Sequence, residues 1–507
     1  MTKRKMLAAC ALGALSALAF APFNLWPLLW FAFPALYLLV MHAEKKRQAF
    51  AFGWSFAFGQ LVVSFHWIAG ALFVDIHSFW WALPFAIAGL PAFFALYYGL
   101  AAMASYALGL RGGQGIFAFA FFWFLASLAR ARLLTGFPWN IEGYVWADWL
   151  AVLQSVSLAG IEGLTLATIL FALLPVCFFV IAKRKHAALF FGLGISLFAL
   201  LAAWGQMRLH QAQENYAEHV YIRLVQPDLR QVLKWQPEQA RKNLDDLMAL
   251  SFEAPAQRPL THYVWPETAA AYKLAQETEL RKHIAQAMQS GSILLTGVLR
   301  TQKNVADEQL YYNSLIAIDS QANVIAGYDK YHLVPFGEYM PFSFLRSVPS
   351  LAMMGTPFTP GPGPRTLRVP NLPPFSPLIC YEAIFSGAVT EREDPPKLLV
   401  NITNDAWYEG TIGPIQHFLI ARTRAVEEGL PLMRVSNMGV TGVFDAYGKP
   451  VAMIAQKDGK SFVDSMLPKA LPELTPMARH GEKTLLTLVI FMALTIAGHK
   501  LFWNRKK

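Results

Sequence analysis

The chain has few charged residues: they make up 15% of its 507 residues, whereas 55% are hydrophobic. In ordinary soluble domains about a quarter of the residues are charged, so this composition excludes that class of protein. The apolar excess lies mostly before residue 206 and again after residue 483, with a mixed composition between them. The sequence therefore predicts a membrane protein that carries one large water-exposed domain.

Two kinds of motif are also missing. The chain has only three cysteines, and no cluster of Cys and His has the spacing of a metal site. No glycine-rich loop has the pattern of a phosphate-binding motif. We therefore expect no metal and no other cofactor.

The net charge of +10 is not arranged as a stripe of the kind that binds nucleic acid. Many basic residues form short clusters beside apolar segments, at 3–5, 45–47, 183–185 and 505–507. Such clusters are typical of positive-inside topology signals. We therefore expect the partner of this chain to be a lipid bilayer and not a nucleic acid.

Eight apolar segments have about the length needed to cross a bilayer core of about 30 Å. With the N-terminus inside, eight crossings place both termini in the cytoplasm, and only Arg130 and Arg132 run against the charge rule. We predict a transmembrane domain of about seven helices at 1–205, an external domain at 206–482, and a last helix with a basic tail at 483–507. The predicted helices are Leu7–Phe20, Trp26–Met41, Phe50–Phe73, Trp81–Leu108, Ile116–Leu128, Gly163–Ile181, Ala187–Trp204 and Leu485–Trp503.

Cys380 is the only cysteine predicted to lie outside the membrane. Cys10 and Cys177 fall in apolar helices, where cysteine packs as a small hydrophobic residue. "LAAC" at 7–10 resembles a lipoprotein cleavage box, but almost no apolar stretch precedes it, which disfavours a signal peptide. A free thiol in an oxidising compartment is costly, which indicates a chemical role for Cys380.

In the external domain, short strand-like runs alternate with amphipathic helices. Strands outnumber helices and several are adjacent, which indicates an α+β or mixed-sheet layered fold. The expected strands are 220–228, 262–267, 292–300, 313–319, 323–330, 375–382, 397–405, 432–437, 439–448 and 461–466, and the expected helices are 238–254, 279–288 and 415–429.

Three polar residues stand where an apolar strand stops: Glu267, Lys330 and Cys380. Strand ends are rigid and open, so they suit catalytic groups. A Cys nucleophile needs a base for its proton and a cation that favours thiolate and oxyanion, roles that Glu and Lys can fill. His332 and His417 could instead form a Cys–His pair, and each residue alone could be merely structural. Residue types therefore leave the triad open.

The surrounding motifs resemble the nitrilase (carbon–nitrogen hydrolase) superfamily. They are "WPE" at 265–267, "YDKYHLVPFGEYMP" at 328–341, "ICYEAIF" at 379–385 and "NITNDAWY" at 401–408. With its flanking apolar helices, nearly the whole chain resembles the bacterial apolipoprotein N-acyltransferase family. "GFPWNIEGY" at 136–144, "GPIQHFLIARTRAVEEG" at 413–429 and "RVSNMG" at 434–439 match that family too, while "VTG" at 440–442 departs from an expected "VSA"-like run.

The resemblance implies a fold and a triad. The fold would be an α/β, nitrilase-like αββα four-layer sandwich inserted between the helices of a polytopic transmembrane domain with about eight helices. Cys380 would be the nucleophile, Glu267 the general base and Lys330 the cation that holds the oxyanion. The main-chain N–H of Tyr381 could also point at the developing oxyanion. The apolar run before Glu267 would keep water away from this base.

The resemblance also implies supporting residues, each of which could alternatively serve the surface or the core. Glu338 would orient Lys330 or the acceptor amine. Tyr381, Glu382 and Trp235 would line the pocket, and Asn313 could face the site. The apolar loop at 340–358 would be badly exposed in a soluble protein, so we expect a lid around Met353–Met354 that dips among lipid tails.

The implied reaction is acyl transfer from a phospholipid, through a Cys380 thioester, to the α-amine of a diacylglyceryl-cysteine on an apolipoprotein. It would take place at the bacterial inner membrane, with the catalytic domain in the periplasm. One alternative is a membrane-anchored amidase, although an anchor needs only one helix. The other is a transporter with an external binding domain. Transporters usually carry ionisable groups inside their spans, whereas the predicted spans have almost none and Glu162 lies at the edge of one.

Overall fold

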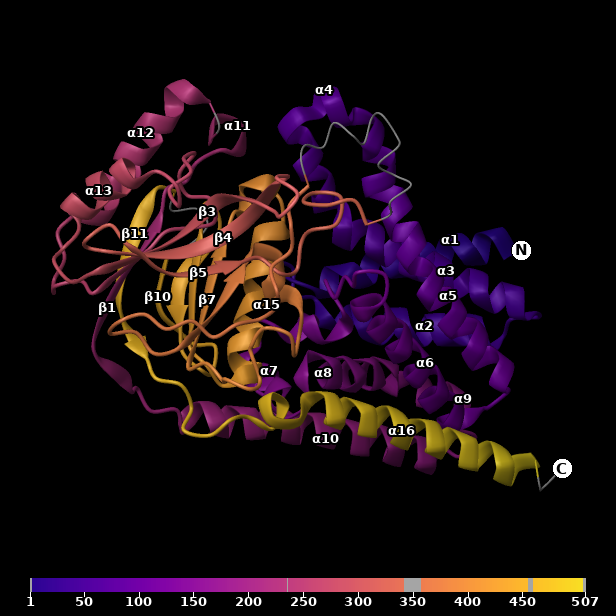
Figure 1. Ribbon diagram of the computed structural model, residues 1–507. Helices are drawn as coiled ribbons and strands as arrows, with labels where there is room; N and C mark the ends of the chain where they lie inside the picture. Colours follow the sequence, from indigo (N-terminus) through magenta and orange to yellow (C-terminus); the bar gives the residue numbers. More distant parts are fainter. Residues whose placement is uncertain (1, 235, 342–356, 455–458, 505–507) are drawn as a thin grey trace. The chain divides into compact units, whose positions relative to one another are not determined.

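The computed structural model describes residues 2–234, 236–341, 357–454 and 459–504 (Figure 1). The chain divides into two compact units, Met1–Ala212 with Leu474–Lys507, and Gln213–Glu473. The first unit is helical, and the second contains both β-sheets. Trp235 and the centre of the predicted lid, including Met353–Met354, lie outside the described residues.

The helical unit contains the segments that can span a membrane. Six helical stretches are long and apolar enough to cross one, and Trp26–Met41 is a shorter apolar helix. This number is roughly consistent with the prediction of about eight, because two of the predicted helices are present but short. The helices are α1 (Thr2–Ser16), α2 (Leu29–Met41), α3 (Lys46–Phe65), α4 (Ile76–Phe79), α5 (Leu90–Leu108), α6 (Gly112–Arg132), α7 (Leu150–Leu153), α8 (Val156–Leu173), α9 (Cys177–Val180), α10 (Arg184–His210) and α16 (Pro476–Asn504).

Several helix ends differ from the prediction. The regular part of the predicted helix Trp81–Leu108 is shorter, because a π-helical turn at Phe85–Gly89 precedes α5. Pro84 and Pro91 flank this turn, and proline interrupts the backbone hydrogen bonds of a helix. α10 and α16 are both longer than predicted where they border the second unit.

Helix α6 carries two arginines that were expected to follow the span. The predicted helix Ile116–Leu128 ends before them, but α6 continues to Arg132. Arg130 is only 1% exposed, and its Nη1 donates to the carbonyl oxygens of Phe137 and Trp139 at 2.7 and 2.8 Å. Such partners offset the cost of burying a guanidinium. The helix therefore carries two arginines in its last turn, beyond the predicted span Ile116–Leu128.

Glu162 lies close to a helix end, as predicted. Helix α8 begins at Val156 but breaks at Ala159 and Gly160, and the φ of +69° at Gly160 suits glycine. Glu162 follows this break in the first turn of the continuing helix. Arg132 Nη2 lies 3.8 Å from Glu162 Oε1, so the carboxylate has a cation within ion-pair range.

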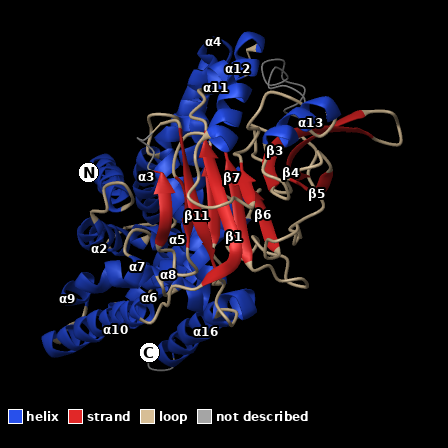
Figure 2. Ribbon diagram, turned by 90° about the vertical axis from the view of Figure 1, so that its left-hand side faces the viewer, coloured by secondary structure: helices blue, strands red, loops and turns tan. Residues whose placement is uncertain are grey.

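The second unit is built on two mixed sheets (Figure 2). The first has six strands in the order β11-β1-β2-β3-β4-β5, and the second has five in the order β10-β9-β8-β7-β6. β1, β2 and β3 pair in parallel, as do β6, β7 and β8, and the other neighbours are antiparallel. The strands are β1 (Tyr216–Gln226), β2 (His262–Val264), β3 (Ile293–Lys303), β4 (Gln309–Asp319), β5 (Val324–Asp329), β6 (Phe375–Ile379), β7 (Leu398–Thr403), β8 (Leu432–Ser436), β9 (Thr441–Phe444), β10 (Pro450–Ile454) and β11 (Ser461–Pro468).

All ten expected strands are present, and one strand was not expected. The sequence reasoning misses β10, an edge strand that begins with Pro450. A proline within a short apolar run lowers the strand signal, because proline cannot donate to a sheet. The expectation of a mixed-sheet fold is confirmed.

The sheets form the two inner layers of a four-layered sandwich (Figure 1). α12 (Pro237–Met248) and α13 (Thr278–Ala287) cover the first sheet, where Leu247 and Ile284 join a cluster with Trp265. α15 (Gly413–Glu428) covers the second sheet, and its Phe418 packs on Phe444 with ring centroids 5.0 Å apart. The αββα sandwich that the resemblance implied is confirmed.

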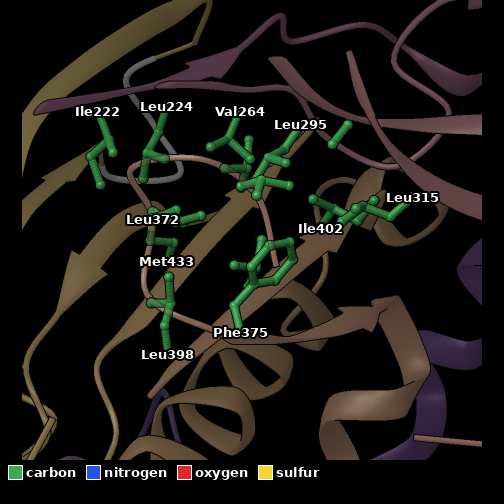
Figure 3. Packing of buried hydrophobic residues seen from close by; sticks show 14 of the residues in the cluster. Ile222, Leu224, Val264, Leu295, Leu315, Leu372, Phe375, Leu398, Ile402 and Met433 are labelled. Carbon is green, nitrogen blue, oxygen red and sulfur yellow. The ribbon is translucent and has the colours of Figure 1, made fainter. Parts of the chain in front are cut away.

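An apolar core fills the space between the two sheets (Figure 3). Each buried Leu, Ile or Phe contributes about 1.5–3 kcal/mol relative to an exposed one. This core fixes the strands, and the candidate site therefore starts from rigid strand ends. The labelled members are Ile222, Leu224, Val264, Leu295 and Leu315 from the first sheet, Phe375, Leu398, Ile402 and Met433 from the second, and Leu372.

Candidate active site

Cys380 follows the last residue of β6 directly and opens a 3-10 turn that runs to Ile384. Its φ is +52°, a left-handed backbone conformation that costs a non-glycine residue about 1–2 kcal/mol. Strain of this kind persists where the surrounding structure fixes it, often at functional sites. The side chain is 6% exposed. The turn thus holds one thiol at the end of a buried strand.

Glu267 lies in the turn that follows β2. Its side chain is buried, and Trp265 just before it is fully buried with its indole Nε1 donating to Ser251 Oγ at 2.7 Å. The turn rests on β3 at Gly297, where an added Cβ would lie 2.6 Å from the Cα of Glu267. Glycine is therefore required at position 297, because a side chain would displace this carboxylate.

Lys330 follows β5 and meets two carboxylates. Its Nζ donates to Glu338 Oε1 at 2.9 Å and lies 3.7 Å from Glu267 Oε1. Asn313 Nδ2 donates to the same two oxygens, at 3.0 Å to Glu338 and 2.6 Å to Glu267. The main-chain N–H of Lys330 also donates to the carbonyl of Asn313 at 2.8 Å. The lysine and the amide therefore hold both carboxylates in one buried cluster.

Opposing charges act on the thiol and on the ammonium group. Burial raises the pKa of Cys380, the charge of Glu267 raises it further, and Lys330 opposes both. Burial would lower the pKa of Lys330, but Glu338, Glu267 and Cys380 together raise it. At neutral pH the resting site therefore holds a protonated thiol beside a charged lysine. A base must remove the thiol proton before the sulfur can attack.

Glu338 and Glu382 hold the segment around Lys330 in different ways. Glu338 Oε2 accepts from the main-chain N–H of Val334 at 2.7 Å, while its other oxygen contacts Lys330. Glu382 Oε1 accepts from Tyr328 Oη at 2.6 Å and from the N–H of Tyr331 at 2.8 Å. Its Oε2 accepts from the N–H of Ile379 at 2.7 Å. Glu382 therefore ties the turn at Cys380 to the Lys330 segment, and its predicted pocket-lining role stays a prediction.

Tyr381 lies next to the nucleophile and is buried. Its ring packs edge-on against Phe385, with centroids 5.1 Å apart, and against His332 at 5.9 Å. Burial raises the pKa of Tyr381, so its hydroxyl stays neutral. The described members of the predicted set all lie in or beside the cluster.

The two histidines of the alternative Cys–His pair have other partners. His417 Nδ1 lies 2.7 Å from Asp405 Oδ1, and its Nε2 lies 3.2 Å from the main-chain oxygen of Cys380. The ring of His332 stacks on Phe385 with centroids 3.6 Å apart. Both nitrogens of His417 are thus engaged with groups other than the thiol. The charge of Glu267, by contrast, acts on the Cys380 thiol.

Sequence reasoning missed two further groups. Asp405 accepts from Arg434 Nη2 at 2.7 Å and contacts His417, so three buried charged or polar groups support the Cys380 carbonyl. Lys234 is 2% exposed and contacts the main chain of Glu267. The only sequence signal for Lys234 is its place beside Trp235 in "LKWQPE". Within the described ranges, no group of three or more His, Cys, Asp and Glu side chains is placed to hold a metal ion.

Two family models match the chain. Residues 12–174 match the apolipoprotein N-acyltransferase N-terminal domain, and residues 222–493 match the carbon-nitrogen hydrolase family. Among solved structures, an amidase from Nesterenkonia sp. AN1 aligns with 51% of this chain and 94% of its own, at 19% identity and a TM-score of 0.35.

Curated relatives match over nearly the full length. Apolipoprotein N-acyltransferase from Brucella melitensis biotype 1 is 37% identical over 513 residues, which is 97% of this chain and 95% of the relative. The enzyme of that name from Rhodopseudomonas palustris is 35% identical over 516 residues, or 98% and 95% of the two chains. Relatives at this identity and coverage, together with both family models, show that the chain belongs to the apolipoprotein N-acyltransferase family.

Proposed function

We propose that this chain transfers an acyl group from a phospholipid to the N-terminal α-amine of an S-diacylglyceryl-cysteine on an apolipoprotein, through a thioester on Cys380. The observation that carries the proposal is the buried cluster of Cys380, Lys330 and Glu267 in a chain that also has six helices able to span a membrane. The cluster supplies a nucleophile, a cation and a base. The helices bring the chain to its lipid substrates.

In the first half-reaction Glu267 takes the proton of the Cys380 thiol, and the sulfur attacks an ester carbonyl of the phospholipid. The negative charge moves to the carbonyl oxygen, where the Lys330 ammonium and the main-chain N–H of Tyr381 stabilise it. The ester C–O bond then breaks. The departing lysophospholipid oxygen takes the proton from Glu267, and the acyl group remains on the sulfur.

In the second half-reaction the neutral α-amine attacks the thioester carbonyl. A free α-amine has a pKa of about 7.7–8.0, so a fraction of it is neutral at physiological pH. Glu267 takes a proton from the attacking nitrogen, the C–S bond breaks, and the sulfur of Cys380 regains a proton. The products are an amide and the resting enzyme. Glu338 and Asn313 hold the side chains of Glu267 and Lys330 in position during both half-reactions.

The catalytic unit acts in the periplasm in this proposal, and both termini are cytoplasmic. The basic clusters beside the apolar segments support this orientation. The phospholipid is a membrane component and the apolipoprotein is membrane-bound, so both reach the site along the bilayer.

The test is a trapping experiment on purified protein. Incubation with phospholipid alone should acylate Cys380, hydroxylamine should release the acyl group, and a diacylated lipopeptide should accept it. Cys177→Ala is the matched control, because Cys177 is buried in the helical unit and should leave the adduct unchanged. Mass spectrometry locates the adduct. Absence of any adduct on Cys380 would refute the thioester route, and release to water alone would identify an amidase-type hydrolase.

A further inference from the structure

A second buried lysine holds the turn that carries Glu267. Lys234 is the last residue of α11 (Gln231–Lys234) and is 2% exposed. Its Nζ donates to the main-chain oxygen of Glu267 at 3.2 Å and to Thr268 Oγ1 at 2.7 Å. Among the described residues, Lys234 and Lys330 are the two buried lysines. Both therefore lie next to Glu267, Lys330 near its carboxylate and Lys234 at its main-chain oxygen.

The backbone of this turn is strained, so contacts from outside the turn must stabilise it. Thr268 has a φ of +44°, a left-handed conformation that is unfavourable for a β-branched residue. The backbone of Gly297 packs directly against this turn, so that an added Cβ would lie 2.6 Å from the Cα of Glu267. The ammonium of Lys234 bonds both Glu267 and Thr268, so it fixes the strained turn with charge-assisted hydrogen bonds.

The segment that carries Lys234 is hydrogen-bonded to residues that follow strands of the second sheet, the sheet whose strand β6 precedes Cys380. Asn404, just after β7, donates from Nδ2 to Gln231 Oε1 at 2.7 Å. Asn437, just after β8, accepts from the N–H of Leu229 at 3.0 Å and donates to its carbonyl at 2.7 Å. Lys234 thus reaches Glu267 from a segment that the second sheet positions. This places the base relative to the strand ends around Cys380.

The charges of the buried cluster balance only when Lys234 is counted. Glu267 and Glu338 are two carboxylates, and Lys330 is the ammonium that contacts both. Without another cation this group would carry one excess negative charge at rest, and again when the oxyanion forms. Burying an unbalanced charge is expensive, so the ammonium of Lys234 stabilises the cluster as a whole.

We propose that Lys234 is a positioning residue that balances the charge of the cluster and holds Glu267 in place to receive the proton of Cys380. The inference rests on the proposed function, because it gives Lys234 a task in that reaction. When Glu267 takes the proton, the negative charge passes to sulfur and then to the oxyanion. The total charge of the cluster is unchanged at each step, and Lys234 stays charged throughout.

The surroundings of Lys234 predict a pH dependence. Burial lowers the pKa of Lys234 to about 8, and the charge of Glu267 opposes this shift. Around this cluster, burial raises the pKa values of Cys380, Tyr381 and Tyr408, and the neighbouring carboxylates raise that of Lys330 against the effect of burial. Burial would raise the pKa of Asp405, but Arg434 and His417 lower it. Lys234 is therefore charged below pH about 8 and loses its charge above it. The acylation rate should fall over the same range.

The experiment measures the single-turnover rate of Cys380 acylation by phosphatidylglycerol between pH 5 and 10 with the full-length protein. This donor has no group that titrates between pH 7 and 10. Lys234→Met should lower the rate at pH 7 by about 10- to 100-fold, the range typical of losing an outer-shell partner that orients a functional group. It should also abolish the alkaline fall. A merely structural role would lower the rate without changing the profile.

Two variants serve as controls. Thr268→Val removes one hydrogen bond and keeps the charge of Lys234, so the alkaline fall should remain. Lys303→Met removes an exposed lysine whose partner is Asp307, and it should leave rate and profile as in the wild type. If Lys234→Met does not fold, the wild-type profile decides, because a rate that stays constant from pH 7 to 10 would overturn the inference.

The outcomes separate the inference from the function on which it rests. If wild-type Cys380 is not acylated at any pH, the proposed function fails. If the wild type is acylated and folded Lys234→Met titrates as the wild type does, only the role of Lys234 fails. Loss of the alkaline fall in folded Lys234→Met supports it.

Discussion

Replacement of Lys330 by methionine separates the chemistry of the site from its stability. Lys330 Nζ lies 2.9 Å from Glu338 Oε1 and 3.7 Å from Glu267 Oε1. At an effective dielectric constant of about 20, charges at these distances interact by roughly 6 and 4 kcal/mol. Desolvation of the buried charges offsets much of this gain. Removing one partner of a buried ion pair therefore typically costs about 3–5 kcal/mol of stability.

The rate should fall for a separate reason. The loss of one oxyanion donor typically costs about 10²–10³-fold. A donor that is also a cation acts on the thiolate as well, so Lys330→Met should slow acylation of Cys380 by about 10³-fold, or roughly 4 kcal/mol of activation free energy. The assay is the single-turnover appearance of the acyl adduct, followed by mass spectrometry, with the free energy of unfolding measured in parallel.

The double variant Lys330→Met/Glu338→Gln makes the test sharp. It removes one positive and one negative charge, so the net charge of the cluster is the same as in the wild type. Most of the stability that Lys330→Met loses should therefore return. The rate should stay low, because the oxyanion has lost its cation. Recovery of the rate to within about tenfold of the wild type would refute the reasoning, since Lys330 would then serve only to hold Glu338.

Four further predictions concern orientation, kinetics and stability. Reporter fusions at Gly112 and Lys282 should report opposite sides of the membrane, and a cytoplasmic signal at Lys282 would contradict the periplasmic assignment. Initial rates measured at varied phospholipid and lipopeptide concentrations should give parallel lines in double-reciprocal plots. Intersecting lines would exclude a ping-pong mechanism. Arg130→Met should lower the free energy of unfolding by about 2–4 kcal/mol, because two carbonyls lose their donor. Arg132→Met should cost far less, because the side chain of Arg132 is 48% exposed. Burial would raise the pKa of Asp405, but Arg434 and His417 lower it overall, so its contribution to stability is present above pH about 4 and is lost as the pH falls through the lowered value. Asp405→Asn should therefore flatten acid unfolding, and an unchanged acid limb would count against the ion pair.

The amino-acid sequence by itself determined the parts of this protein that depend on local pattern. Long apolar stretches specify spanning helices, and short apolar runs bounded by turn residues specify strands, whatever the chain does elsewhere. The same runs show that Cys380 and Lys330 stand directly at strand ends. Where the local pattern is weak, the prediction is weaker: β10 begins with a proline and was missed, and helix ends shifted where proline interrupts the hydrogen bonds.

Only the tertiary structure decided which charged groups meet. Glu267 and Lys330 follow strands of the first sheet and Cys380 follows a strand of the second, so their meeting depends on how two sheets pack. Arg130 is buried in a helix where the hydroxyl of Tyr98, 32 residues away in the chain, accepts from its guanidinium at 3.1 Å. Lys234 is a surface-type residue in the sequence, yet it is buried against the base. A charged side chain is stable in the interior only with specific partners, and such partners come from segments far apart in the chain, which no local period records.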